Sequence, residues 1–142
     1  MSMTFPTRVC SFGLLWKEGK LGVIQLESIH WPDHFHLIGG GVEFGETPMQ
    51  ALIREWEEEV AIKVLKATPF TNISALFDRK GVPGSPFHTV GMVYTIEEYE
   101  LLPNSKSERE LVWKSPKELQ EAPCFPILDS LLCDLSLCEC TI

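Results

Sequence analysis

The segment from Thr47 to Val60 constrains the fold of this chain most, because it carries a full set of helix signals. Thr47 is a good N-cap, Pro48 suits the first helical position, and Gln50 completes a capping box with Thr47. At about 100° per residue, one stripe of the helix collects the apolar residues Met49, Leu52, Ile53, Trp56 and Val60. We therefore predict an amphipathic helix from Pro48 to about Val60 whose apolar stripe packs on a core.

Three carboxylates, those of Glu55, Glu58 and Glu59, share a face beside this stripe. Like charges at this spacing repel by roughly 0.2–0.5 kcal/mol per pair in an isolated helix, and Arg54 relieves only part of the repulsion of Glu58, four residues later. A divalent cation would neutralise the surplus, and ligands made only of oxygen suit Mg²⁺, Mn²⁺ or Ca²⁺. The Asp-rich loop of an EF-hand is absent, so we expect Mg²⁺ or Mn²⁺. A solvated acidic face is the alternative that composition alone favours.

Other segments predict strands by their apolar and β-branched residues, with Gly- and Pro-containing connections between them. The first two strands should form a hairpin, residues 29–36 should form a loop, and Gly39, Gly40 and Gly41 should break the chain. Shorter helices are expected after Ser115, a second N-cap followed by Pro, and over residues 127–137. Because helices and strands alternate unevenly, we predict one α/β domain over residues 1–142, with a mixed sheet flanked by helices. The expected strands are 8–16, 21–27, 35–38, 62–67, 71–77, 87–97 and 110–113.

The net charge of −8 excludes some partners. A nucleic-acid polymer needs a basic surface to replace its counterions, and the sequence shows none. No apolar run reaches the roughly 18 residues of a membrane span, and no secretory signal pattern opens the chain. We therefore expect a cytoplasmic protein with a small-molecule partner and no membrane partner. Reduced thiols are expected at the four cysteines without paired spacing near the C-terminus, which are Cys124, Cys133, Cys138 and Cys140.

The spacing of residues 40–62 is more specific than their composition. Gly40 is followed after five residues by Glu46, and after seven more by the sequence REWEEEVAI, which begins at Arg54. This pattern resembles the Nudix box, G-x5-E-x7-R-E-U-x-E-E-x-G-U with U a bulky aliphatic residue, and every charged position is filled. The chain thus resembles the Nudix hydrolase superfamily (MutT-like), which implies a Nudix-type α/β/α sandwich. Trp56 and Ala61 depart from the box, and Ala61 in place of Gly should cost about 1 kcal/mol or shift the helix end.

The resemblance implies a role for each charged position of the box. Glu58 and Glu59 correspond to the principal metal ligands, and Glu55 to a ligand or to the base that deprotonates the attacking water. The Gly39 carbonyl is a further candidate ligand. Arg54 would orient these carboxylates by charge-assisted hydrogen bonds. The expected catalytic residues are therefore Glu55, Glu58 and Arg54.

Residues around the box receive supporting roles from the same resemblance. Glu46 would support the junction of loop and helix or a metal, and Gly40 would support the turn. Many family members take one more acid from a downstream loop, and Glu108 is favoured here over Glu97, Glu98 and Glu110. Glu43 and Glu57 are expected to be peripheral.

The implied reaction is hydrolysis of a pyrophosphate bond by water attack on phosphorus, with Mg²⁺ or Mn²⁺ as the metal. The box does not encode the substrate, and the lack of several subfamily signatures favours a nucleoside triphosphate or a similar small organic pyrophosphate over other nucleoside diphosphate-X compounds. A Nudix-fold domain that binds a nucleotide without turnover is the alternative, but the four glutamates at 46, 55, 58 and 59 favour an enzyme. The resemblance also makes a homodimer plausible.

Substrate contacts outside the box are harder to assign. Arg79, Lys80 and His88 are the candidates, because mobile loops on a rigid scaffold often carry specificity. An aromatic cluster at a strand edge is favoured over base stacking or metal binding for a group of His, Trp and Phe residues. This group comprises His30, Trp31, His34, Phe35 and His36.

Overall fold

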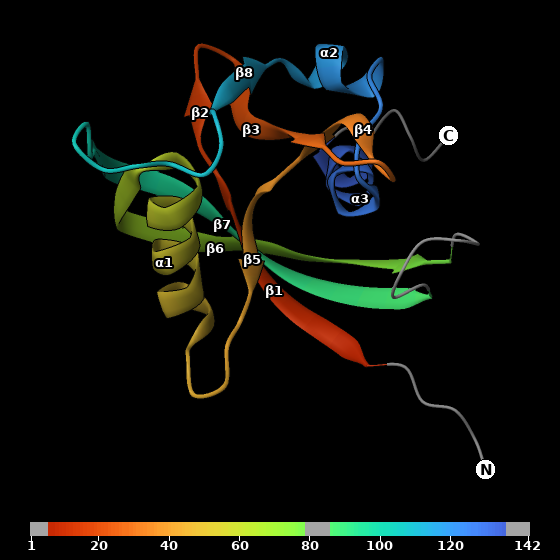
Figure 1. The fold of residues 1–142 in the computed structure, drawn as a ribbon, viewed down its shortest axis with the longest axis horizontal. Coiled ribbons are helices and arrows are strands. Elements are labelled where there is room, and N and C mark those ends of the chain that lie inside the picture. The colour runs from red at the N-terminus through yellow and green to blue at the C-terminus, as the bar shows by residue number, and fades with distance from the viewer. Residues whose placement is uncertain (1–5, 79–85, 136–142) are drawn as a thin grey trace.

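A computed structural model describes residues 6–78 and 86–135 of the chain (Figure 1). The helices are α1 (Pro48–Val60), α2 (Pro116–Gln120) and α3 (Pro126–Leu135). The strands are β1 (Thr7–Leu14), β2 (Trp16–Lys17), β3 (Lys20–Glu27), β4 (Pro32–His36), β5 (Ile38–Gly41), β6 (Ile62–Phe77), β7 (Phe87–Leu101) and β8 (Val112–Lys114).

Two sheets form the frame of the molecule. The first has the strand order β5-β1-β7-β6, in which β1 runs parallel to β7 and the other neighbours are antiparallel. This is the predicted mixed sheet. The second is antiparallel, with the order β2-β3-β4 and with β8 added to β3. Strand β5 lies at an edge of the mixed sheet, and the functional groups of α1 gather beside this edge.

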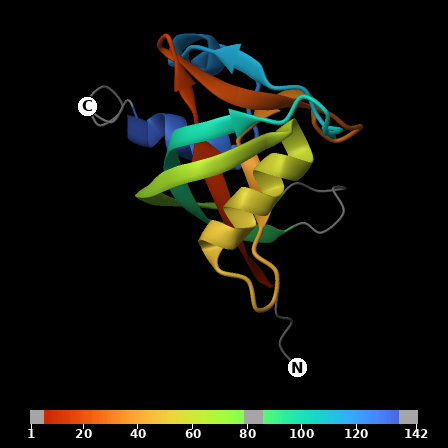
Figure 2. The same cartoon turned by 90° about the vertical axis from the view of Figure 1, so that its left-hand side faces the viewer.

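Helices α1 and α3 lie on opposite faces of the mixed sheet, as Figures 1 and 2 show. Side chains alternate across a strand, so β6 and β7 supply residues to a separate core on each face. Trp56 and Leu52 of α1 lie in one core with Ile38, Ile62 and Ile96. In the other core, Ile127, Leu128, Leu131 and Leu132 of α3 pack with Cys10, Phe12 and Leu14 of β1. The predicted sandwich of helix, sheet and helix is confirmed.

Helix α1 begins and ends where its signals predict. The Gln50 N–H donates to Thr47 Oγ1 over 3.1 Å, and the Thr47 N–H donates to Gln50 Oε1 over 2.8 Å, which completes the capping box. Ala61 follows Val60 with φ 54° and ψ 45°, so the helix ends with Ala in the left-handed conformation instead of shifting its end. For a residue with a Cβ this conformation costs roughly 1–2 kcal/mol.

The predicted hairpin is wrong in its main part. Only Trp16 and Lys17 pair with the start of β3, whereas β1 leaves this sheet and lies between β5 and β7. The physical reason is burial, because residues 10–14 are all buried and such a strand must be covered on both faces. Pairing with β7, about 80 positions later in the sequence, provides that cover.

Three other predictions of where strands are interrupted are wrong. Gly39, Gly40 and Gly41 belong to β5 and pair with Phe12, Ser11 and Cys10, because glycine also fits a strand where another group approaches the backbone closely. A Cβ on Gly39 would overlap the Ser11 carbonyl oxygen. Part of the predicted loop 29–36 is strand β4, which pairs with β3. Residues 62–67 and 71–77 form one strand, β6, whose register against β7 shifts at three places.

Two smaller predictions concern the start of α2 and the cysteines. The capping box of Ser115 and Glu118 starts α2, as expected. Cys124 is a free thiol, as is the buried Cys10, and Cys133 is exposed, while Cys138 and Cys140 lie outside the described residues. None of the helices in residues 6–78 and 86–135 has the length and apolar character needed to cross a membrane.

Candidate active site

Arg54 of α1 is the centre of the acidic site. Its Nε and Nη2 atoms donate to both carboxylate oxygens of Glu46, over 2.7 and 3.0 Å. Its Nη1 atom donates to Glu55 Oε1 over 2.8 Å, and Nη2 also donates to the Gly41 carbonyl over 3.0 Å. Glu58 Oε2 lies 3.5 Å from Nη1. One guanidinium therefore joins the loop before α1, the edge strand β5 and the acidic face of the helix.

This network sets the charge state of its members. The Arg54 guanidinium beside Glu46 lowers the pKa of that carboxyl to about 2, with a smaller contribution from the Glu43 N–H. The hydrogen bond to Glu46 in turn raises the pKa of Arg54 above its usual value. Both groups stay ionised at neutral pH. The Glu43 side chain lies 3.7 Å from Arg54 Nη1 and is 71 % exposed, so it is peripheral.

Glu55 and Glu59 form a second unit on the face of α1 that meets β5. Glu59 is only 8 % exposed, and its carboxyl shares a hydrogen bond with that of Glu55. The Gly39 N–H donates a further hydrogen bond to Glu59. Burial, followed by the hydrogen bond and the charge of Glu55, raises the pKa of Glu59. Two carboxylates that repel each other when both are charged thus lie side by side, partly buried, in the face of α1 that meets β5.

Gly40 makes room for this unit. A Cβ built on Gly40 would lie 2.7 Å from both Cδ and Oε1 of Glu55, which is far inside van der Waals contact. Trp56 fixes the helix at the same strand, because it is fully buried and its Nε1 donates to the Ile38 carbonyl over 3.1 Å. Trp56, which departs from the box pattern, therefore fills the core, as predicted, and holds α1 against β5.

The carboxylates of α1 fit an oxygen-bound divalent metal. Two of them, Glu55 and Glu59, lie beside each other, and Glu58, on the same face of the helix, has a side chain that is 49 % exposed. Across the described residues, the His, Cys, Asp and Glu side chains form no ready group of three around one point. The candidate metal ligands are therefore the neighbouring carboxylates of Glu55 and Glu59, with the more exposed carboxylate of Glu58 as a third. Mg²⁺ suits such a set, because it keeps several waters and binds through one or two carboxylates and substrate phosphates.

The loop after β7 covers the C-terminal end of α1. The Glu108 N–H donates to the Glu58 carbonyl over 3.1 Å, and the Arg109 N–H donates to the Glu59 carbonyl over 2.8 Å. Glu108, the loop acid favoured from the sequence, is thus bound to the helix through its backbone N–H, and the residue is exposed. The positive charge of Arg109 acts on Glu59 and lowers its pKa, opposing the larger effect of burial. Sequence reasoning missed Arg109, because only the folded loop brings it to the helix.

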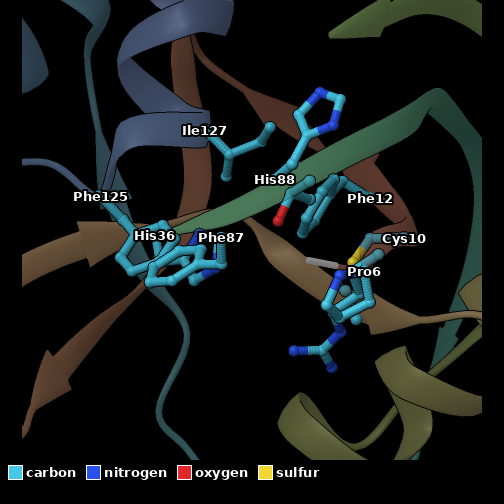
Figure 3. Close-up of a pocket in the computed structure, with 12 residues that line it drawn as sticks. Pro6, Cys10, Phe12, His36, Phe87, His88, Phe125 and Ile127 are labelled. Carbon is cyan, nitrogen blue, oxygen red and sulfur yellow. The ribbon is translucent and has the colours of Figure 1, made fainter. Parts of the chain in front are cut away.

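A pocket of about 450 Å³ opens on the other side of β5 (Figure 3). It reaches Gly39 and Gly40 at one end, and aromatic residues and Arg8 line it. A second, shallower pocket of about 630 Å³ contains Arg8 and Glu55. Arg8 therefore lies where the two pockets meet, and a Cβ on Gly41 would lie 3.0 Å from its Nη2. Sequence reasoning missed Arg8 as well, although a cation at the start of a buried strand is a usable signal.

The other candidates for substrate contact fall in different places. His88 lines the 450 Å³ pocket, and its Nδ1 lies 3.1 Å from Thr7 Oγ1. Arg79 and Lys80 lie outside the described residues. The expected aromatic cluster is present in part, because Trp31 packs against His34, while Phe77 and Phe125 from other segments complete the packing around Trp31. Glu57, which was expected in solvent, is half-buried.

Comparisons with known proteins agree on the fold. A family model described as the NUDIX domain matches residues 5–135. No curated protein matches the sequence significantly. A MutT NUDIX hydrolase from Burkholderia pseudomallei has 22 % identity and a TM-score of 0.71, with 89 % of this chain and 96 % of that chain covered. The E. coli ORF135 protein has 22 % identity and a TM-score of 0.65, with 94 % of each chain covered. A MutT protein from Methanosarcina mazei Go1 has 16 % identity and a TM-score of 0.68, covering 97 % and 98 %.

Proposed function

The chain belongs to the Nudix hydrolase family, and from this premise we propose that it cleaves a pyrophosphate bond by Mg²⁺-dependent attack of water on phosphorus. As a member of this family it is an enzyme, a pyrophosphohydrolase. The proposed substrate is a nucleoside di- or triphosphate, or a nucleoside diphosphate linked to another group. The observation that carries the proposal is the Arg54 network, which holds Glu46 and Glu55 in place while the Glu55 carboxylate lies against Gly40 and beside that of Glu59.

We propose a separate role in metal binding or proton transfer for each residue of this site. Glu55, Glu58 and Glu59 would hold the metal, with the Gly39 carbonyl as a further oxygen donor. When bound, Mg²⁺ screens phosphate charge and lowers the pKa of a bound water. Arg54 keeps Glu55 in place through the 2.8 Å hydrogen bond, so that this carboxylate serves as a ligand or accepts the proton of the attacking water.

Arg8 extends the proposed site toward the phosphates. Its guanidinium lies at the junction of the two pockets, beside the Gly41 backbone. The ion pairs of the described residues do not include Arg8, so its charge is available to an anion. A guanidinium can bind two phosphate oxygens at once, which favours Arg8 as the anchor of the polyphosphate chain. The negative net charge of the chain is thus compatible with a small polyanion, because Arg8 and bound metal would make the site locally positive.

Two further features belong to the proposal. We take residues 1–142 as one Nudix domain with its box at residues 40–62, in which both cores share the mixed sheet. The free thiols of Cys10 and Cys124 favour a reducing compartment such as the cytoplasm.

Turnover of a nucleotide panel in ¹⁸O-labelled water tests the proposed function. The panel holds nucleoside di- and triphosphates and nucleoside diphosphate-X compounds, each with and without Mg²⁺. We expect metal-dependent hydrolysis of at least one compound, with one ¹⁸O atom in a single phosphate product, and loss of this hydrolysis in Glu58→Gln and Glu59→Gln. Nucleotide binding without turnover, or equal turnover by the variants, contradicts the proposal.

A further inference from the structure

Ser11 of β1 and Glu59 of α1 are the two buried residues of polar or charged type in the part of the chain that the structure describes. Ser11 is the more enclosed of the two, with an exposed fraction of 0 %. Serines mostly lie at the surface of proteins, and the residues enclosed most often are apolar. A hydroxyl at this position therefore needs a reason that an alanine of nearly the same size would not satisfy.

The hydroxyl of Ser11 is bound to the first turn of α1. Its Oγ atom donates to the carbonyl of Pro48, the first residue of the helix, over 2.7 Å. A carbonyl oxygen has two lone pairs, so this one accepts from Ser11 as well as from within the helix. Because a hydrogen bond needs its donor and acceptor aligned, the contact fixes the start of α1 on β1 more narrowly than apolar packing does.

The register of the sheet places this contact beside the carboxylates. Ser11 pairs directly with Gly40 in the antiparallel ladder of β1 and β5. Opposite residues of such a pair face the same side of the sheet, and α1 packs on this side (Figures 1 and 2). The Ser11 hydroxyl thus reaches the helix next to the Cβ-free position of Gly40, against which the Glu55 carboxylate lies.

The two paired residues act on α1 in different ways. Helical side chains lean toward the start of their helix, so the Glu55 carboxylate lies over the turn before its own Cα. The carboxylate of Glu55 and the carbonyl of Pro48 therefore meet two neighbouring residues of one ladder. Gly40 allows the close approach of the helix, and Ser11 holds the helix at that approach.

Other hydrogen bonds fix the later turns of α1 to the sheet. Arg54 Nη2 donates to the Gly41 carbonyl over 3.0 Å, and Trp56 Nε1 donates to the Ile38 carbonyl over 3.1 Å. Ser11 supplies the corresponding contact at the first turn. Without it, α1 stays attached at its later turns and its start is free to tilt, which moves the carboxylate that leans toward that start.

We propose that Ser11 is a positioning residue of the metal site. Its hydroxyl holds the first turn of α1 at the distance from β5 at which Glu55 and Glu59 bind a divalent cation. The proposal rests on the proposed function, because it assigns the cation to these carboxylates. It extends that function to a residue outside the box and outside the lining of both pockets. Ser11 acts only through the placement of the helix.

The test measures metal binding by the free protein as well as turnover. Mn²⁺ binding without nucleotide is followed by electron paramagnetic resonance, and turnover at increasing Mg²⁺ gives the half-saturating concentration of Mg²⁺. The variants are Ser11→Ala, which removes the hydroxyl, and Ser11→Thr, which keeps it and adds a methyl group. Ser130→Ala is the matched control, because Ser130 Oγ of α3 donates to the Ser74 carbonyl of β6 over 3.2 Å and joins a helix to the other face of the sheet.

In Ser11→Ala, the Kd of Mn²⁺ and the half-saturating concentration of Mg²⁺ should both rise about 3- to 10-fold, the equivalent of one neutral hydrogen bond. Ser11→Thr should bind Mn²⁺ more tightly than Ser11→Ala. Ser130→Ala should lower the melting temperature by a few degrees, as Ser11→Ala does, and keep both metal constants of the wild type. All constants are measured well below the melting temperatures, so that every variant is folded.

Wild-type metal constants in Ser11→Ala would overturn the inference, and so would an equal rise in Ser11→Ala and Ser130→Ala, because the hydroxyl would then serve stability alone. Equal constants in Ser11→Ala and Ser11→Thr would also overturn it, since the hydroxyl would not be the group responsible. A wild type without Mn²⁺ binding contradicts both the inference and the proposed function. The predicted shifts in Mn²⁺ affinity without hydrolysis of any nucleotide contradict the proposed function and leave the role of Ser11 standing.

Discussion

Substitution of Gly40 by Ala tests the closest approach in the site. The added Cβ would lie 2.7 Å from Cδ and Oε1 of Glu55. Carbon atoms of this kind rest roughly 3.5 Å apart, so the carboxylate has to move by about 0.8 Å. The hydrogen bonds from Arg54 to Glu55 and between Glu55 and Glu59 hold it in its present position. We expect Glu55 to leave its position and the site to lose its preformed geometry.

The expected effect on activity is large and the effect on stability is moderate. A misplacement near 1 Å in a catalytic site costs up to about 100-fold in rate, so kcat/KM with Mg²⁺ should fall roughly 10- to 100-fold. Overpacking costs about 1–3 kcal/mol, which for a domain of this size lowers the melting temperature by several degrees. The rise in melting temperature on addition of Mg²⁺, a mass-action effect, should shrink or vanish in Gly40→Ala.

Gly19→Ala is the control for this experiment. Gly19 has φ 78°, so Ala is strained there, but a Cβ at Gly19 has no atom within 4 Å and the residue lies in the turn between β2 and β3. This variant should lose stability and keep both kcat/KM and the response to Mg²⁺. If Gly40→Ala keeps the activity and the Mg²⁺ response of the wild type, the packing of Glu55 against Gly40 does not control the site.

Three further changes have defined outcomes. Arg54→Lys keeps the charge but loses the two-pronged contact with Glu46, so the free energy of unfolding in urea should fall, by an amount limited by the exposure of the pair to solvent. Ala61→Gly relieves the left-handed conformation at the end of α1 and should raise the free energy of unfolding by about 0.5–1 kcal/mol, measured in the same way. The pH dependence of stability should contain a contribution from His36, whose pKa falls from the ordinary histidine value of 6.5 to about 4 in the folded chain. Between these values the unfolded chain binds the extra proton, so stability falls as the pH falls from 6.5 to 4, by roughly 3 kcal/mol in all, and His36→Phe should lack this loss.

Each of these expectations has a contrary result. If Arg54→Lys has the free energy of unfolding of the wild type, a single positive charge is enough for stability and the two hydrogen bonds to Glu46 are not needed. Destabilisation of Ala61→Gly would show that the entropy of Gly outweighs the relief of strain. An equal loss of stability on acidification in the wild type and in His36→Phe would show that His36 is not held neutral.

Local signals explain why α1 could be predicted from the sequence. The cap at Thr47, the proline at 48 and the apolar stripe all lie within a few turns, and they agree with one another. The same periodicity placed Glu55, Glu58 and Glu59 on one face. It could not show that Glu59 is buried while Glu58 is half-exposed, because that difference arises where α1 packs on β5.

Long-range pairing explains what the sequence did not reveal. The polar residues between β1 and β3 suit a hairpin, but the burial of β1 is satisfied by β5 and β7, and this pairing brings Arg8 beside Gly41. His36 was assigned only to an aromatic cluster, since its unpartnered nitrogen depends on Phe12 and Phe125, which come from distant segments. Contacts between segments so far apart leave no periodic signal in either one.

The most direct test of the central claim is the Mg²⁺-dependent turnover of the best nucleotide by Glu59→Gln, with nucleotide binding measured in parallel. The substitution keeps the shape of the side chain and removes its charge at the carboxylate pair. The account predicts that kcat falls by about 100-fold or more, since even partners of metal ligands cost 10- to 100-fold, while nucleotide affinity changes little. A variant that turns over as fast as the wild type at the same Mg²⁺ concentration would contradict the assignment of this carboxylate pair as the catalytic centre.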